Sequence, residues 1–297
     1  METSKNLTEA IAAEGTMPVE GTELYYRSVG SGTPPVITVH GGPGLGHYYL
    51  RPGMDALADR FRVVYYDQRG SGRSELGDPD RVTLAGGIDD LKALIEGLGI
   101  ERANLVGHSF GADLIALFAS RHPDRVASLV LANPGPPFDP DQQSVLWAEM
   151  ARRRTPEDLA EWERIQGSEG FAARDPAVLE AHVRMMYMPF FSDRALASTV
   201  SYGFTAVTAA NFPEAGERTY RDLDPPAAIA GLKAIECPTL VVRAELDPIP
   251  EAFSRQVADA IPGARYSFIR GANHFTYLEA PKPFFAAVGD FLSEEAR

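Results

Sequence analysis

The architecture follows from one segment, Ala103-Asn104-Leu105-Val106-Gly107-His108-Ser109-Phe110-Gly111. Its first four residues predict a strand, and residues 112–121 are apolar nearly all round, which predicts a buried helix. Gly-x-Ser-x-Gly joins the two. The turn is so tight that its flanking positions must lack bulk, which explains both glycines. Such a turn lifts the Ser109 hydroxyl above the sheet, at the positive end of a helix, where a nucleophile is expected.

Strands and helices alternate on both sides of this segment. Short apolar runs predict strands at 36–39, 62–66, 128–131, 239–242 and 264–269. Helical patterns occupy 52–60, 82–99, 251–261 and 281–293. This alternation predicts an α/β fold with a mostly parallel central sheet flanked by helices. Residues 22–29 are expected to add a strand, and the residues before them to be loose or helical.

The alternation stops between residues 135 and 231, where several amphipathic helices and no clear strand are found. We therefore expect a core domain of residues 1–134 and 232–297, and an inserted helical cap of residues 135–231 that roofs a pocket. Within the cap, residues 185–191 read Met-Met-Tyr-Met-Pro-Phe-Phe. We expect this segment to pack the cap onto the core, with an apolar pocket wall as the alternative.

A serine nucleophile needs a histidine base and an acid that orients it. In this arrangement the acid and the histidine follow the nucleophile along the chain. His274 is the histidine in the loop after the last expected strand. Asp247 follows the strand before that one, with Glu245 as the alternative, whereas Asn133, one strand earlier, cannot carry the charge. The predicted catalytic residues are Ser109, Asp247 and His274.

The oxyanion formed in such a reaction needs two backbone N–H donors. Phe110, directly after the nucleophile, is expected to supply one of them. The other should come from the glycine-rich segment at 40–44, in which Pro43 has no N–H, so Gly42 is the predicted donor. The glycines of this segment do not match a dinucleotide-binding pattern, no phosphate-binding loop is found, and no paired Cys/His spacing suggests zinc. We expect neither a cofactor nor a metal.

Composition restricts the partners of this 297-residue chain. Its net charge of −13 makes nucleic acid a poor partner, because phosphate binding needs clustered Lys and Arg. The single cysteine, Cys237, excludes an intrachain disulfide, and no membrane span or signal segment is expected. A cytoplasmic protein that acts on a small-molecule or short-peptide substrate is the expectation, and the oligomeric state stays open.

Two motifs extend these predictions, namely His40-Gly41-Gly42-Pro43-Gly44 and Asp67-Gln68-Arg69-Gly70-Ser71-Gly72-Arg73-Ser74. Together they resemble the proline iminopeptidase (prolyl aminopeptidase) family of α/β-hydrolase serine peptidases. The resemblance covers about residues 20–134 and 235–295. It implies the α/β-hydrolase fold with a cap, no metal, the same three catalytic residues, and release of N-terminal residues, often proline, from short peptides.

The expected reaction is acyl transfer through an acyl-enzyme, with aminopeptidase activity as the leading function. Several aminopeptidases of this kind carry a glutamate directly after the catalytic aspartate to hold the substrate amine, whereas Pro248 occupies that position here. A carboxylesterase or lactonase acting on a small-molecule ester, or a hydrolase of secondary metabolism, is therefore the alternative. A non-catalytic ligand-binding relative is a third possibility, against which the complete set of catalytic residues argues.

Overall fold

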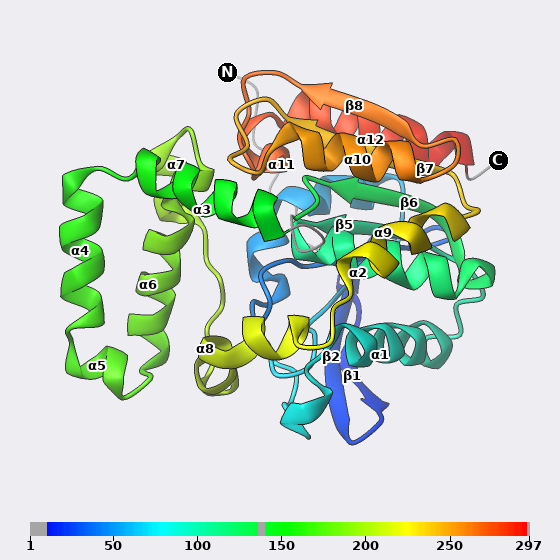
Figure 1. The fold of residues 1–297 in the computed structure, drawn as a ribbon. Helices are drawn as coiled ribbons and strands as arrows, with labels where there is room; N and C mark the ends of the chain where they lie inside the picture. The colour runs from blue at the N-terminus through cyan, green and yellow to red at the C-terminus, as the bar shows by residue number, and fades with distance from the viewer. Residues whose placement is uncertain (1–10, 136–139, 296–297) are drawn as a thin grey trace, which may run out of the picture.

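A computed structural model of the protein describes residues 11–135 and 140–295 (Figure 1). Eight strands form one sheet in the order β1-β2-β4-β3-β5-β6-β7-β8. The strands are β1 Ile11–Val19, β2 Thr22–Val29, β3 Val36–Val39, β4 Val63–Tyr66, β5 Ala103–His108, β6 Val126–Ala132, β7 Thr239–Ala244 and β8 Arg265–Ile269. β2 is antiparallel to both of its neighbours, and all pairs from β4 to β8 are parallel. The predicted α/β fold with a mostly parallel sheet is confirmed.

Helices cover both faces of the sheet. They are α1 Leu84–Gly97, α2 Phe110–Arg121, α10 Glu251–Ala260, α11 Thr276–Glu279 and α12 Pro281–Glu295. α2 packs against β3, β5 and β6 and contacts α1, while α12 packs against β6 and β8 from the other side. The expected helix at 52–60 is the 3-10 helix η2 Gly53–Asp59, which contacts α12.

The expectation for the chain before Thr22 is wrong in part, because β1 is a strand and not a loose or helical segment. β1 pairs antiparallel with β2 at the edge of the sheet, and its residues from Ala13 to Val19 alternate between half-buried and exposed. An edge strand that buries little side-chain surface needs few large apolar residues, so its alternation is weak in the sequence. The residues before Ile11 lie outside the described part of the chain.

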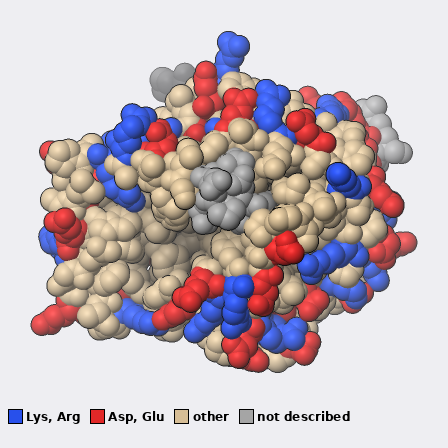
Figure 2. Space-filling model, in the orientation of Figure 1, with Lys and Arg blue, Asp and Glu red and all other residues tan. Residues whose placement is uncertain are grey.

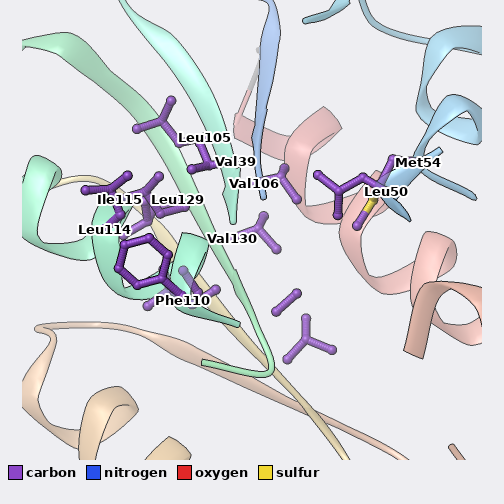
Figure 3. Close-up of a cluster of buried hydrophobic side chains, with 14 of the residues drawn as sticks. Val39, Leu50, Met54, Leu105, Val106, Phe110, Leu114, Ile115, Leu129 and Val130 are labelled. Carbon is purple, nitrogen blue, oxygen red and sulfur yellow. The ribbon is translucent and has the colours of Figure 1, made fainter. Parts of the chain in front are cut away.

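The core fills the space on both faces of the central strands (Figure 3). Leu105 and Leu129 point toward α2, whereas Val106 and Val130 point to the opposite face, because neighbouring side chains alternate along a strand. All four side chains are buried. Since both faces of a parallel sheet are covered, continuous apolar runs such as that of β5 form its strands.

Every regular element described between β6 and β7 is helical (Figure 1). These are α3 Pro140–Arg153, α4 Pro156–Gln166, α5 Glu169–Ala172, α6 Pro176–Tyr187, η5 Met188–Phe190, α7 Arg194–Thr199, α8 Ala206–Tyr220, α9 Pro225–Gly231 and η6 Leu232–Ala234. Polar side chains cap the first turns of α4 to α9, as Thr155 does for α4 and Asp175 for α6. α9 contacts α2 and α10 of the core, and the division into core and cap stays a prediction. Within residues 11–135 and 140–295, no helix is long and apolar enough to cross a membrane.

Candidate active site

Ser109 lies in the turn between β5 and α2, with a φ of 55° that non-glycine residues rarely adopt. The chain passes very close to the end of β3 at this point, so the turn has room only for a glycine at position 111. A Cβ atom on Gly111 would collide with the backbone of Val39 and His40. The strained conformation therefore presents Ser109 at the start of a buried helix, as the motif predicted.

Asp247 and His274 are brought together by the loops that follow β7 and β8. The Nδ1 atom of His274 lies 3.0 Å from Oδ2 of Asp247, and both side chains are buried. The other carboxyl oxygen, Oδ1, accepts a hydrogen bond from the Ile249 N–H at 3.0 Å. Glu245, the alternative acid, is exposed and accepts a hydrogen bond from the Gly271 N–H, so it is not the partner of His274.

The carboxyl of Asp247 has a third partner that the sequence did not indicate. Nη1 of Arg243 lies 3.1 Å from Oδ2 of Asp247, in a pair that is almost completely buried. Burial raises the pKa of the Asp247 carboxyl, but His274 and Arg243 lower it by more, so the pKa falls below its ordinary value. Asp247 is therefore ionised at neutral pH, as an orienting acid must be.

The imidazole of His274 is oriented for use as a base. Because Nδ1 faces a carboxylate, the proton of the neutral ring lies on Nδ1 and the lone pair on Nε2. Nε2 is buried and has no hydrogen-bond partner among the described residues. The ring of His108, the residue before Ser109, lies 4.7 Å from the ring of His274 between centroids. The turn that carries Ser109 and the loop that carries His274 thus meet.

The two predicted oxyanion donors line the same pocket as Ser109. Gly42 has a φ of 56°, and a Cβ atom there would lie 2.6 Å from both Leu45 Cδ1 and the Tyr187 hydroxyl. Phe110 is the first residue of α2. Neither of these two N–H groups has an acceptor among the described residues, so both are free to bind a developing negative charge.

The chain just after the glycine-rich segment is held by the buried carboxylate of Asp67. Oδ1 of Asp67 accepts hydrogen bonds from the backbone N–H of His47 at 2.7 Å and from its Nδ1 at 2.8 Å. Oδ2 accepts the Arg73 N–H at 2.8 Å. Arg69 forms a buried ion pair with Asp90 of α1. These residues fix the loops beside the site and are not placed to contact a substrate.

A pocket opens above Ser109, with about 640 Å³ of empty space that is partly open to solvent, and is lined also by the two predicted oxyanion donors. Its remaining walls are aromatic and aliphatic. They come from α3, the end of α6, η5, the end of α8 and the loop after β7, through Leu146, Trp147, Met150, Met186, Tyr187, Phe190, Tyr220 and Ile249. Figure 2 shows this face of the molecule hollowed between α3–α7 and the core. No charged side chain is found among the described lining residues.

The methionine- and aromatic-rich segment at 185–191 has both of the functions considered for it. Met188, Phe190 and Phe191 are buried against the core, and Phe191 stacks on Phe275 at 4.1 Å between ring centroids. Met186, Tyr187 and Phe190 also line the pocket. The ring of Phe190 lies 4.4 Å from that of His274 between centroids. The segment therefore connects the pocket wall to the predicted base.

Five acidic side chains of the α3–α8 region pair with arginines. Glu149 pairs with Arg152 and Arg153, and Glu214 pairs with Arg174. Other carboxylates do the same, namely Asp158 with Arg194, Glu161 with Arg164, and Glu180 with Arg184. None of these carboxylates lines the pocket. Nor do three His, Cys, Asp or Glu side chains gather into a metal-binding group within the described residues.

Asn133 is a functional candidate whose importance the sequence did not reveal. It follows β6 with a φ of 47°, and its Oδ1 accepts the Ala244 N–H at 2.9 Å. Its Nδ2 donates to the His274 carbonyl at 2.5 Å and to Thr276 Oγ1 at 2.6 Å. Asn133 therefore connects the ends of β6 and β7 to the backbone of the predicted base. Only its position directly after a strand could have suggested this.

Comparisons with known proteins show the family of the chain. The family model of the alpha/beta hydrolase fold matches residues 34–281. The chain is 27% identical to a proline iminopeptidase of Lactobacillus helveticus, over 95% of this chain and 98% of that protein. It is 32% identical to the putative carbamate hydrolase RutD of Caulobacter sp. strain K31, over 87% and 95%.

Among solved structures, the crystal structure of the proline iminopeptidase of Mycobacterium smegmatis superposes with a TM-score of 0.69. The two sequences are 26% identical, and the match covers 96% of this chain and 99% of that one. The family match extends over most of the chain, and the relatives are hydrolases. The protein is an enzyme that belongs to the α/β-hydrolase family.

Proposed function

We propose that the protein is a serine hydrolase that forms an acyl-enzyme. Ser109 attacks the substrate carbonyl while His274 Nε2 takes its proton, and Asp247 holds the imidazole and stabilises its charged form. The N–H groups of Gly42 and Phe110 bind the oxyanion. The proton on His274 then passes to the leaving alkoxide, which departs as the alcohol, and water repeats the attack on the acyl-enzyme to release the acid and free Ser109. The Asp247–His274 hydrogen bond and the unpartnered Nε2 support these roles.

We further propose that the acyl group of the substrate is apolar and uncharged, and that the substrate is a small-molecule ester or lactone. The observation that carries this proposal is the absence of a charged side chain among the described residues of the pocket wall. A buried ammonium group without a carboxylate partner loses its hydration and gains nothing in return. Aromatic and aliphatic walls instead favour a hydrocarbon acyl group.

An aminopeptidase is the second candidate, because proline iminopeptidases match over 95% or more of the chain. Such an enzyme must pair the substrate ammonium with carboxylates. The residue after Asp247 is proline, and Ile249 beyond it adds an apolar side chain to the pocket. These features favour the ester over the peptide.

Two substrates of matched shape separate the candidates, namely the phenyl esters of cyclopentanecarboxylic acid and of L-proline. Their acyl rings differ only where a methylene replaces the ammonium, and their leaving groups are identical. We expect kcat/KM to be at least about tenfold higher for the cyclopentane ester, which corresponds to about 1.4 kcal/mol. Ser109→Ala is the control that shows which turnover depends on the site.

The opposite preference would contradict the ester proposal. A higher kcat/KM for the proline ester, together with cleavage of L-proline anilide, would establish the aminopeptidase. Equal turnover of both esters by the wild-type protein and by Ser109→Ala would contradict the acyl-enzyme proposal as well.

A further inference from the structure

A buried chain of hydrogen bonds connects the glycine-rich loop to the loop of His274. The Gly41 N–H donates to the Tyr49 hydroxyl at 2.5 Å. The same hydroxyl lies 3.1 Å from Nδ1 of His108, and Nε2 of His108 lies 3.0 Å from the backbone carbonyl oxygen of His274. Tyr49 and His108 are each 2% exposed, so water does not compete for these bonds.

The direction of each proton in this chain is determined. A carbonyl oxygen only accepts, so Nε2 of His108 carries the proton and donates to His274. Nδ1 then holds a lone pair and accepts from Tyr49, whose oxygen accepts the Gly41 N–H. Burial, reinforced by the nearby His274, lowers the pKa of His108 to about 3, which keeps its ring neutral. Every donor in the chain has one acceptor.

The two ends of this chain of hydrogen bonds are parts of the proposed catalytic site. Gly41 directly precedes Gly42, the predicted oxyanion donor, and His274 is the predicted base. The His274 carbonyl accepts a second hydrogen bond, from Asn133 at 2.5 Å. Tyr49 and His108 do not line the pocket, so they can act only through the groups they hold.

We propose that Tyr49 and His108 are positioning residues for acyl transfer, which hold the oxyanion loop and the base at a fixed separation. The inference rests on the proposed acyl-enzyme function. Both donor and base must stay within about half an ångström of their productive positions, and a displacement of about 1 Å costs about a hundredfold in rate. The loops that carry Gly42 and His274 are distant in sequence, and the hydrogen bonds of Tyr49 and His108 join them.

Tyr49→Phe removes only the hydroxyl that joins the two halves of the chain. We expect kcat for the cyclopentane ester to fall between about ten- and a hundredfold, with KM changed by less than about twofold. The rate of labelling by a fluorophosphonate should fall in parallel. Tyr66→Phe is the matched control, because the Tyr66 hydroxyl is equally buried and has no partner among the described residues. Its kcat should stay within about twofold of wild type.

His108 gives a second, independent test if Tyr49→Phe does not fold. The side-chain amide of His108→Gln can donate to the His274 carbonyl in place of Nε2, whereas His108→Leu cannot. We expect the glutamine variant to retain at least about tenfold more kcat than the leucine variant. Because His108 is neutral, the pH at which kcat/KM is half-maximal should be the same for the glutamine variant and for wild type.

The outcomes separate this inference from the proposed function. A wild-type protein that neither reacts with the fluorophosphonate nor cleaves the ester contradicts the acyl-enzyme proposal itself. If wild type reacts normally and Tyr49→Phe matches Tyr66→Phe, the positioning role is wrong while the function stands. Equal kcat for His108→Leu and His108→Gln contradicts the role in the same way.

Discussion

The Nη1 atom of Arg243 lies 3.1 Å from Oδ2 of Asp247, the carboxyl oxygen that also faces Nδ1 of His274. Nη2 of the same guanidinium donates to the backbone carbonyl of Asp247 at 3.0 Å. One arginine thus fixes both the backbone and the charge of the predicted orienting acid. The acid is ionised in the interior because two cationic or polar partners compensate for its burial.

Replacing Arg243 should raise the pKa of Asp247, because the arginine is one of the groups that lower it. In Arg243→Gln the free energy of unfolding should therefore begin to fall at a higher pH as the protein is acidified. A lowered pKa of a carboxyl stabilises the folded state above the unfolded pKa, and this stability is lost as the pH falls through the folded value. The free energy of unfolding of the variant at neutral pH should therefore be about 3 kcal/mol lower than that of wild type.

Arg243→Lys is the control, since it retains the charge but not the fork of donors. In this variant the pH at which the free energy of unfolding begins to fall should stay nearer to that of wild type. An Arg243→Gln protein with the wild-type pH dependence of unfolding would show that Arg243 does not tune the pKa of Asp247. Denaturant unfolding at a series of pH values is the measurement.

Asp247→Asn tests the choice of acid. An amide in this position no longer favours the Nδ1–H form of His274, and kcat should fall about 10⁴-fold. Glu245→Gln, in the exposed alternative acid, should change kcat by less than about twofold. If the two substitutions exchanged these effects in ester hydrolysis, the assignment of the acid would be wrong.

Gly42→Ala should abolish most of the activity, because its Cβ would displace Leu45 or the Tyr187 hydroxyl and move the oxyanion donor. We expect a loss of about a hundredfold in kcat, similar to the loss of one oxyanion donor. Gly263→Ala is the control, because Gly263 has a comparable positive φ of 70° and no atom lies within 4 Å of the new Cβ. Wild-type kcat in Gly42→Ala, measured beside this control, would exclude Gly42 from the oxyanion site.

Asp113 lies in the first turn of α2, is fully buried and has no well-formed hydrogen bond to a described residue. Burial raises the pKa of its carboxyl well above the ordinary value. The unfolded chain therefore releases this proton at lower pH than the folded one, and stability falls as the pH rises between the two pKa values. The free energy of unfolding of Asp113→Asn should be higher than that of wild type at pH 8, and the difference should be smaller at pH 4.

Denaturant unfolding at both pH values measures this effect. Asp290→Asn, at an exposed site, should change stability by less than about 0.5 kcal/mol at either pH. A destabilised Asp113→Asn at pH 8 would mean that the folded protein uses the ionised carboxylate.

Local sequence patterns predicted the central sheet, the turn of Ser109 and the loops of Asp247 and His274. These depend on neighbours in the chain, namely apolar runs, flanking glycines and positions just after strands. β1 was missed because an edge strand needs little apolar surface. The sequence could not predict the contacts of Tyr49 with His108 or of His108 with His274, because their partners are 59 and 166 positions apart.

The sequence could not predict the substrate pocket either. Its wall combines residues from α3, α6 and α8 with Ile249, and only the folded chain shows that Glu149 and Glu214 of these helices pair with arginines. The segment at 185–191 had the composition of both a core contact and a pocket wall, and composition alone does not separate these two functions.

Peptide mapping by mass spectrometry after reaction with a fluorophosphonate tests the account at its centre. We predict one phosphonyl group per chain, on Ser109, with labelling slowed by at least about a hundredfold in His274→Ala. A wild-type protein that stays unlabelled, or carries the group on another residue, would contradict the assignment of Ser109 as the nucleophile.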